Sequence, residues 1–367
     1  MSGSKPPFAF DGIRILFIGH DPIGTTGTAS KYFYPVIAAQ LGAKVAVVGD
    51  WSGAAPQMPW GIRVFDVSMA GGGRCRAKKV REVVRNFCPD VVHVFFHRGF
   101  GWYRYHCGDL GAKWVVDVRG PLLATGLRRS VSRLLNNCER LGYDATAGHS
   151  IGSVDTVFGK WVAKSACHTR IGVDVKQFAQ RSHLTSGPFR FVYVGGIDRR
   201  RQLETMLRAF ALASKKMNLT LDLIGDGDDT EALMDLVSRE GINGVRFLGR
   251  FPHSKIAEML AVYDGALSYI GPSVYDSGPP LKTLEYFAAG LPVVASDTRG
   301  NRMLMSAGVE GVFDPEGTTE SLSDAMVQLA GSDIQVLSGN ARRKAEASSW
   351  QQVVPVDLSN LYSRILA

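Results

Sequence analysis

Short apolar runs alternate with helical patterns along the whole chain, and this alternation is the strongest constraint on its fold. The runs are apolar at nearly every position, as in residues 13–18, 45–48, 91–96 and 114–118, and several end in Gly, Asp or His. Strands that are apolar on both faces are typical of parallel sheets covered by helices on both sides. The repeated order of strand, loop, helix and strand therefore predicts an α/β chain with doubly wound sheets.

The same alternation begins afresh after a polar stretch at residues 181–188. The strands expected in this half are 189–194, 219–224, 245–248, 266–270 and 292–295. A chain of 367 residues is long for one core. We therefore expect two Rossmann-like domains that face a central cleft, 1–183 and 184–345, and a C-terminal helix within 346–367. That helix packs either on its own domain or back on the first one.

Charge is divided unevenly between the two halves. Residues 1–183 hold 24 Lys and Arg against 12 Asp and Glu, a net of +12; the totals of 42 and 34 leave 18 and 22 for residues 184–367, a net of −4. A basic half predicts an anionic surface or partner. Residues 74–140 mix basic and aromatic side chains, which suit an anionic membrane surface or form a merely solvated basic face. No nucleic-acid motif accompanies the charge, so we expect no nucleic-acid partner.

Composition argues against several other classes of protein. No run approaches the roughly 18 apolar residues that cross a bilayer, and residues 1–10 lack the apolar core of a signal peptide. The five cysteines are scattered and odd in number, which favours reduced thiols over a disulfide framework or a zinc site. We expect a cytoplasmic protein without metal or cofactor, peripheral at the inner face of the membrane if the basic half binds lipid.

The densest group of candidate site residues lies at 277–294. Gly278 and Pro280 stand in a loop that opens a helix at Leu281, and the free N–H groups of a helix start bind anions. Lys282 adds a positive charge at that turn. Glu285 follows on roughly the same face, where it can accept hydrogen bonds from two ribose hydroxyls. An ordinary helix with a salt-bridged Glu is the alternative.

A second group of candidates follows the strand at 189–194. Gly195 and Gly196 allow a ligand to approach the backbone closely. Arg199, Arg200 and Arg201 then stand at or just before a helix start, where guanidinium groups suit a diphosphate. A solvated basic turn is the alternative.

In their order and spacing these segments resemble glycosyltransferase family four, the large retaining GT-B family of glycosyl transferases group 1. The resemblance covers nearly the whole chain and is strongest from Phe191 to Asp314. The segments that carry it are Pro89–Val94, Ile171–Phe178, Val194–Phe210, Leu223–Gly227, Val245–Phe251 and Ser277–Val294. Arg201 stands where the family usually has a phosphate-binding Lys, and Gly196 where it usually has an Arg.

The main departure from the family concerns its paired glutamates. Glu285 fits the second of the pair, the one that binds ribose, whereas the first falls at Ser277 with Asp276 beside it. The contact to the donor sugar then comes from Asp276, from Ser277 or from backbone amides. A role for Asp276 in only capping the turn is the alternative.

The resemblance implies a retaining glycosyltransferase that takes a sugar from a nucleotide-diphosphate donor, without an essential metal, and gives it to an acceptor hydroxyl. Between UDP and GDP, UDP is favoured on general grounds and not by any residue of this sequence. The acceptor is not identified. The catalytic residues that we expect are Asp117, Arg119, Arg201, Lys282 and Glu285. The donor-binding residues that we expect are Gly195, Gly196, Arg200, Arg201, Gly225, Arg250, Phe251, Asp276, Ser277, Gly278, Pro280, Leu281, Lys282, Thr283 and Glu285.

Two features of the first half complete the expected site. Asp117 and Arg119 end a strand on one face, where they bind sugar hydroxyls or form a structural ion pair. The loop with Gly24, Gly27 and Thr28 is expected to cover the diphosphate or the acceptor, and it lacks the Gly-Lys-Ser/Thr of a P-loop. The acidic stretch 226–229 is interpreted as a helix cap and not as a metal site.

Two other functions stay open at this point. A nucleotide-sugar epimerase or hydrolase of the same fold would need an acid/base pair at the sugar carbon, for which Asp117 is the one clear candidate. A nucleotide-sugar-binding protein without catalysis is made plausible by the missing first glutamate.

Overall fold

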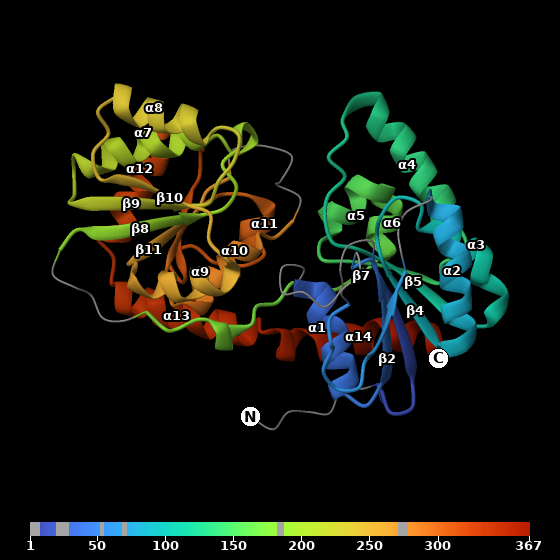
Figure 1. Cartoon of the computed structure of the whole chain (residues 1–367). Coiled ribbons are helices and arrows are strands. Elements are labelled where there is room, and N and C mark those ends of the chain that lie inside the picture. The colour runs from blue at the N-terminus through green and yellow to red at the C-terminus, as the bar shows by residue number, and fades with distance from the viewer. Residues whose placement is uncertain (1–7, 20–28, 52–54, 68–71, 182–186, 271–277) are drawn as a thin grey trace. The chain divides into compact units, whose positions relative to one another are not determined.

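The protein divides into two compact units, shown in the computed structural model of Figure 1. The structure describes residues 8–19, 29–51, 55–67, 72–181, 187–270 and 278–367. Unit 1 consists of Met1–Ile171 and Trp350–Ala367, and unit 2 of Gly172–Ser349. Each unit is built on one parallel sheet with helices packed on it, so the predicted doubly wound α/β class is confirmed.

The described residues of unit 1 form a seven-stranded parallel sheet in the order β3-β2-β1-β4-β5-β6-β7. Its strands are β1 (Arg14–Ile18), β2 (Lys44–Gly49), β3 (Arg63–Asp66), β4 (Val91–Phe95), β5 (Lys113–Val118), β6 (Ala145–Gly148) and β7 (Cys167–His168). Its helices are α1 (Ala29–Gln40), α2 (Gly72–Phe87), α3 (Gly101–Cys107), α4 (Gly126–Arg140), α5 (Ile151–Phe158), α6 (Lys160–Ser165) and α14 (Trp350–Leu366).

Strand β1 explains why the runs are apolar at nearly every position. Successive side chains of a strand point to opposite faces of the sheet. Ile15 and Phe17 are buried in a core with α1 and α14, whereas Leu16 and Ile18 are buried in a second core with α2 and α3. Because helices cover both faces, neither set of side chains meets water.

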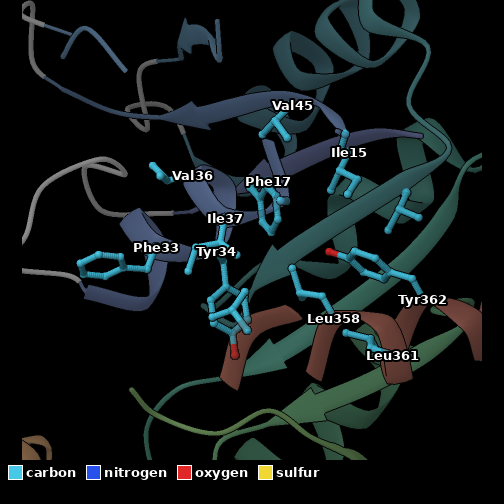
Figure 2. Packing of buried hydrophobic residues seen from close by; sticks show 14 of the residues in the cluster. Ile15, Phe17, Phe33, Tyr34, Val36, Ile37, Val45, Leu358, Leu361 and Tyr362 are labelled. Carbon is cyan, nitrogen blue, oxygen red and sulfur yellow. The ribbon is translucent and has the colours of Figure 1, made fainter. Parts of the chain in front are cut away.

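The last helix, α14, packs in unit 1 although it ends the chain. Its Trp350 stacks on Phe33 of α1, with ring centroids 5.3 Å apart. Leu358 and Tyr362 enter the same core further along the helix (Figure 2). The Arg170 main-chain N–H also donates to Asp357 Oδ2 of α14, at 2.6 Å. The terminal helix therefore completes the core of the unit formed by the N-terminal half.

The division between the units falls earlier than residue 183, where the change in composition placed it. Segment 172–181 packs with unit 2. The Val173 N–H donates to the Ser348 carbonyl, at 3.2 Å, and the Phe178 ring lies 6.2 Å from the His253 ring. Backbone pairing of this kind leaves no mark in composition.

The described residues of unit 2 form a six-stranded parallel sheet in the order β10-β9-β8-β11-β12-β13. Its strands are β8 (Phe189–Val194), β9 (Leu219–Ile224), β10 (Val245–Gly249), β11 (Gly265–Ser268), β12 (Val293–Ser296) and β13 (Gly311–Asp314). Its α-helices are α7 (Leu203–Ser214), α8 (Thr230–Arg239), α9 (His253–Met259), α10 (Leu281–Ala288), α11 (Arg299–Arg302), α12 (Thr319–Ala330) and α13 (Ile334–Ala347). Helices α7, α8 and α12 lie over one face of this sheet, and α9, α10 and α13 lie over the other (Figure 1).

Candidate functional site

Helix α10 begins directly after Pro280, which has extended backbone angles and makes no side-chain cap. Pro280, the residue at the N-cap position, therefore offers the first N–H groups of the helix no side-chain acceptor of its own, the arrangement that leaves N–H groups for a ligand. Gly278 lies two residues earlier, and a Cβ on Gly300 would stand 2.1 Å from the Gly278 carbonyl oxygen. Only glycine at position 300 lets α11 approach the loop at Gly278 so closely. Asp276 and Ser277 lie outside the described residues.

Lys282 turns inward from the first turn of α10. Its Nζ lies 4.2 Å from the centre of the Tyr193 ring and 3.4 Å from the Tyr269 carbonyl oxygen. Neither contact is with a carboxylate. Burial, and then the positive charge of Arg201, hold the pKa of Lys282 well below its usual value. A partly buried amine beside a second cation is poised to accept an anion.

Arg201 comes from the turn that follows β8. This turn runs through Gly195 and Gly196 into a short 3-10 helix, Arg199–Arg201. Arg201 Nε donates to Asp198 Oδ2, at 3.2 Å. Against the lowering effect of burial, the Tyr193 hydroxyl, which donates to the Gly196 carbonyl at 3.2 Å, lies close enough to raise the pKa of Arg201. Arg200 is exposed. The Tyr193 side chain thus touches both Lys282 and Arg201, and brings two cations from distant parts of the sequence to one place.

Gly225 brings the ends of β8 and β9 together. A Cβ on this residue would lie 1.9 Å from the Gly195 carbonyl oxygen, and its φ is +148°. The adjacent Asp226 accepts from the Gly227 N–H and the Thr230 hydroxyl, at 2.8 and 3.1 Å. These contacts fasten Asp226 to the side chain of Thr230, the first residue of α8, but they satisfy no main-chain N–H of the helix, so the capping role of the acidic stretch stays a prediction.

Two further candidates follow β10 in the sequence, and a third lies within α10. Arg250 is exposed and Phe251 half-buried, directly after Gly249. The Thr283 side chain is fully buried, with its Oγ1 2.6 Å from Ser268 Oγ and 3.2 Å from Asn301 Oδ1. The hydroxyl of Thr283 is therefore committed to the interior of unit 2.

Glu285 has a partner that sequence reasoning missed. His253 Nε2 lies 2.8 Å from Glu285 Oε1, and because a carboxylate only accepts, the imidazole donates. The Glu285 side chain keeps 16% of its surface exposed. One residue later, the Tyr286 hydroxyl accepts from the Val194 N–H, at 2.7 Å, and ties α10 to the end of β8. The position of His253, at the start of the helix after β10, was the available signal.

The pair predicts a pH-sensitive group in unit 2. The hydrogen bond that His253 donates to Glu285 raises the pKa of His253 above its usual value of 6.5, against the lowering effect of burial. We expect NMR titration to give a pKa above 6.5 for His253. In the Glu285→Gln variant this pKa should fall to 6.5 or below, because only burial then acts on the imidazole. A folded-state pKa raised in this way stabilises unit 2 fully below about pH 6.5, and the gain fades as pH rises through the folded value. An unchanged titration in Glu285→Gln would contradict the pairing.

Asp117 and Arg119 form an ion pair in unit 1. Arg119 Nη2 lies 2.5 Å and Nε 2.9 Å from Asp117 Oδ2, and His93 Nε2 lies 3.1 Å from the same oxygen. Asp117 has no exposed surface, so in this structure its carboxylate faces other side chains and not solvent. The sequence left two roles open for these residues, binding sugar hydroxyls or forming a structural ion pair. The structure shows the ion pair.

The surroundings of this ion pair are also polar and buried. The Arg119 guanidinium lies 4.4 Å from the centre of the Tyr34 ring, and His93 Nδ1 lies 3.0 Å from the Tyr362 hydroxyl. Burial lowers the pKa of His93. The neutral imidazole therefore donates from Nε2 to Asp117 and accepts at Nδ1 from Tyr362. Gly24, Gly27 and Thr28 lie outside the described residues.

Residues 188–332, which hold all of the described unit 2 candidates, match the family model of glycosyl transferases group 1. The chain is 25% identical over 207 residues to WcaL of Salmonella typhimurium, assigned as a colanic acid biosynthesis glycosyltransferase; the match covers 54% of this chain and 50% of WcaL. It is 24% identical over 292 residues to the GDP-mannose-dependent alpha-mannosyltransferase of Mycobacterium tuberculosis, covering 75% and 73%. The chain thus spans about half the length of the first curated relatives it matches.

Solved structures agree on the fold. The UDP-glucose complex of Anabaena Alr3699/HepE aligns with a TM-score of 0.73 at 17% identity, over 96% of this chain and all of that one. The predicted GT-B fold is confirmed by this likeness. For residues 188–332 the match to glycosyl transferases group 1 agrees with the predicted family resemblance.

Proposed function

We propose that this chain, in which residues 188–332 are a glycosyl transferases group 1 domain, transfers a sugar from a nucleotide-diphosphate donor to an acceptor hydroxyl. One observation carries the proposal. Lys282 and Arg201 meet at Tyr193, beside the start of α10, where Pro280 makes no side-chain cap, within the region that matches the family. An anionic ligand would relieve the repulsion between the two cations and satisfy the helix start at the same time.

In this proposal the diphosphate binds at the start of α10. Lys282 and Arg201 neutralise its charge, and the loops at Gly195 and Gly225 let the ligand approach the backbone. Glu285, fixed by His253, accepts hydrogen bonds from the ribose. Arg250 and Phe251 lie nearer the base, and Asp276 or Ser277 near the sugar.

The chemistry needs charge stabilisation above all. As the bond between the anomeric carbon and the diphosphate oxygen breaks, negative charge grows on the leaving group, where Lys282 and Arg201 stabilise it. The departing oxygen takes the proton of the acceptor hydroxyl, which attacks from the same face and so retains the anomeric configuration. Protein cations then do the work that a metal does in other transferases, and no side chain has to act as the base.

For the nucleotide we propose UDP, with GDP as the second candidate. The aligned Anabaena structure is a complex with UDP-glucose, whereas the mycobacterial relative is named for GDP-mannose. As further partners we propose an acceptor in polysaccharide, glycolipid or glycoside synthesis and an anionic membrane surface that unit 1 contacts from the cytoplasmic side.

Thermal-shift measurements with UDP, GDP, UDP-glucose and GDP-mannose test the donor site. A ligand at a hundredfold excess over its Kd stabilises the folded state by about 2.7 kcal/mol, which is a rise of several degrees in Tm. Donor consumption is then followed with and without acceptor sugars or lipids. Consumption without acceptor would point to an epimerase or hydrolase, and binding without consumption under every condition would point to a binding protein. No shift with any of the four nucleotides would end the proposal.

A further inference from the structure

Helix α4 turns its apolar side away from unit 1. Among its 15 residues, the two that are buried, Ser132 and Asn136, are polar. Its apolar residues recur at positions i, i+4, i+7 and i+8 and so share one face. They are between 49% and 81% exposed: Leu127, Val131, Leu134 and Leu135. The amphipathic pattern is thus reversed relative to a helix that packs on a core.

Hydrogen bonds hold α4 in this rotation. The side-chain amides of Asn136 and Asn137 donate to the carbonyls of Val157 and Phe158, at 3.3 and 2.9 Å. Arg133 Nε donates to the Thr156 carbonyl, at 3.1 Å. Rolling the leucines inward would break these contacts and bury the polar groups, so the outward leucine face is built into unit 1.

The other arginine-rich helix of unit 1 behaves in the ordinary way. Helix α2 turns its apolar residues inward, with Val80, Val84 and Phe87 each at most 3% exposed. Outward-facing leucines are therefore a particular property of α4 and do not follow from a basic composition.

Basic side chains border the leucine face. The lining of a groove of about 620 Å³ beside α4 includes Leu127, Val131 and Leu135 together with Arg98 and Arg128. Both arginines are exposed, and none of the lining residues is acidic. Exposed apolar groups gathered in one patch mark an interaction surface. An apolar floor with a cationic rim matches the interface of a bilayer that carries anionic lipid.

We propose that α4 and its groove dock unit 1 onto an anionic lipid bilayer, with the leucines among the outer acyl carbons and Arg98 and Arg128 against lipid phosphates. The inference rests on the membrane contact of the proposed function and assigns it to one surface, but it does not require sugar transfer. Within the described residues no helix is long and apolar enough to span a membrane, so the contact proposed is with the bilayer surface. A second copy of this chain that used the same groove would cover the leucines but would offer Arg98 and Arg128 no anionic partner, because the groove lining holds no acidic residue.

Vesicle flotation tests the docking surface. We expect the protein to float with vesicles of equimolar phosphatidylcholine and phosphatidylglycerol at low salt, and not with phosphatidylcholine alone. The double variant Leu134→Ser, Leu135→Ser should bind roughly tenfold or more weakly, because two apolar side chains no longer insert. Arg128→Glu should weaken binding by about fivefold or more. The matched control is Met234→Ser on α8, which is also half-exposed and should bind like the wild type.

A dye at Cys138 gives a second readout in an otherwise intact helix. Cys138 is exposed and stands one turn beyond Leu134, on the same face of α4. The emission of a polarity-sensitive dye at Cys138 should shift to the blue when the mixed vesicles are added. The emission of the same dye at Cys75 of α2 should not shift. In each labelled protein the other exposed cysteines are changed to serine. No flotation at low salt, equal binding by wild type and the leucine variant, or a leucine-dependent dimer without lipid binding would overturn the proposal.

Failure of docking and failure of transfer are distinguishable in the same samples. The leucine variant should show the wild-type thermal shift with UDP, because α4 is in unit 1 and the donor residues are in unit 2. Flotation without any nucleotide shift would leave docking standing and remove the donor site. A thermal shift with nucleotide but no flotation would leave the donor site standing and remove the docking surface.

Discussion

Replacing Lys282 with methionine is expected to weaken UDP binding by about tenfold to a hundredfold, since a hydrogen bond to a charged group contributes about 1.5–3 kcal/mol. Methionine has nearly the length of the lysine stem and can keep the contact with the Tyr193 ring. The free protein should be as stable as the wild type or more so. The variant no longer holds an amine that burial and Arg201 both disfavour in its charged form.

This combination separates a binding role from a structural one. A lysine that only supported the fold would lower Tm when replaced and leave the nucleotide affinity of the folded protein unchanged. Isothermal titration with UDP gives the affinity, and calorimetric unfolding gives Tm. The matched control is Lys255→Met on α9 of the same unit, because Lys255 is 57% exposed and pairs only with Glu258 among its described ionic contacts. UDP binding by Lys282→Met that equals that of the wild type would contradict the proposed site.

The central strands were predictable because strands that are buried on both faces consist almost entirely of apolar residues. In β1, β4 and β5 both faces meet helices, so nearly every position is apolar and the run stands out; His93 and Asp117 are the buried polar exceptions. Strand β3 lies at the edge of its sheet, with no buried residue, and β7 spans only two residues. Such strands form because a neighbouring strand offers hydrogen bonds, and neither of them was predicted from the sequence.

The candidate site was predictable at the level of segments and less so at the level of side chains. Spacing brings Lys282 and Glu285 to the same part of α10, but it cannot tell that Thr283 between them is buried against Ser268 and Asn301. The His253 partner of Glu285 comes from another helix, and only the fold brings the two together. For α4, the sequence shows an amphipathic helix but not which face is turned outward, because backbone carbonyls at the end of α5 decide it.

Replacing Asp117 with asparagine is expected to lower the free energy of unfolding of unit 1 by about 3–5 kcal/mol, the usual cost of removing one partner of a buried ion pair. Asparagine keeps the shape of the side chain but leaves Arg119, which is only 13% exposed, without a counter-charge. The matched control is Asp109→Asn. Asp109 also pairs with an arginine, Arg81, but it is 60% exposed, so its loss should cost no more than about 1 kcal/mol.

The chain offers a selective probe for this measurement. All six tryptophans, at positions 51, 60, 102, 114, 161 and 350, fall within unit 1. Urea unfolding followed by tryptophan fluorescence therefore reports on unit 1 alone, while nucleotide binding reports on unit 2. A midpoint for Asp117→Asn equal to that of Asp109→Asn would show that the ion pair does not stabilise the unit. Loss of transferase activity at unchanged stability would instead favour a direct role for Asp117 in handling the sugar.

Acid should remove the same stabilisation from the wild type. Burial alone would raise the pKa of Asp117, but Arg119 and His93 outweigh it and lower the value to about 2. Since an unfolded Asp titrates near pH 4, the depressed folded value means that the carboxylate stabilises unit 1 fully above about pH 4 and loses this effect as pH falls toward 2. The wild type should therefore lose more of its urea midpoint than Asp117→Asn between about pH 5 and about pH 3. If both proteins lose the same amount, other carboxylates control acid unfolding, and the Asp117 ion pair is not what the acid dissociates.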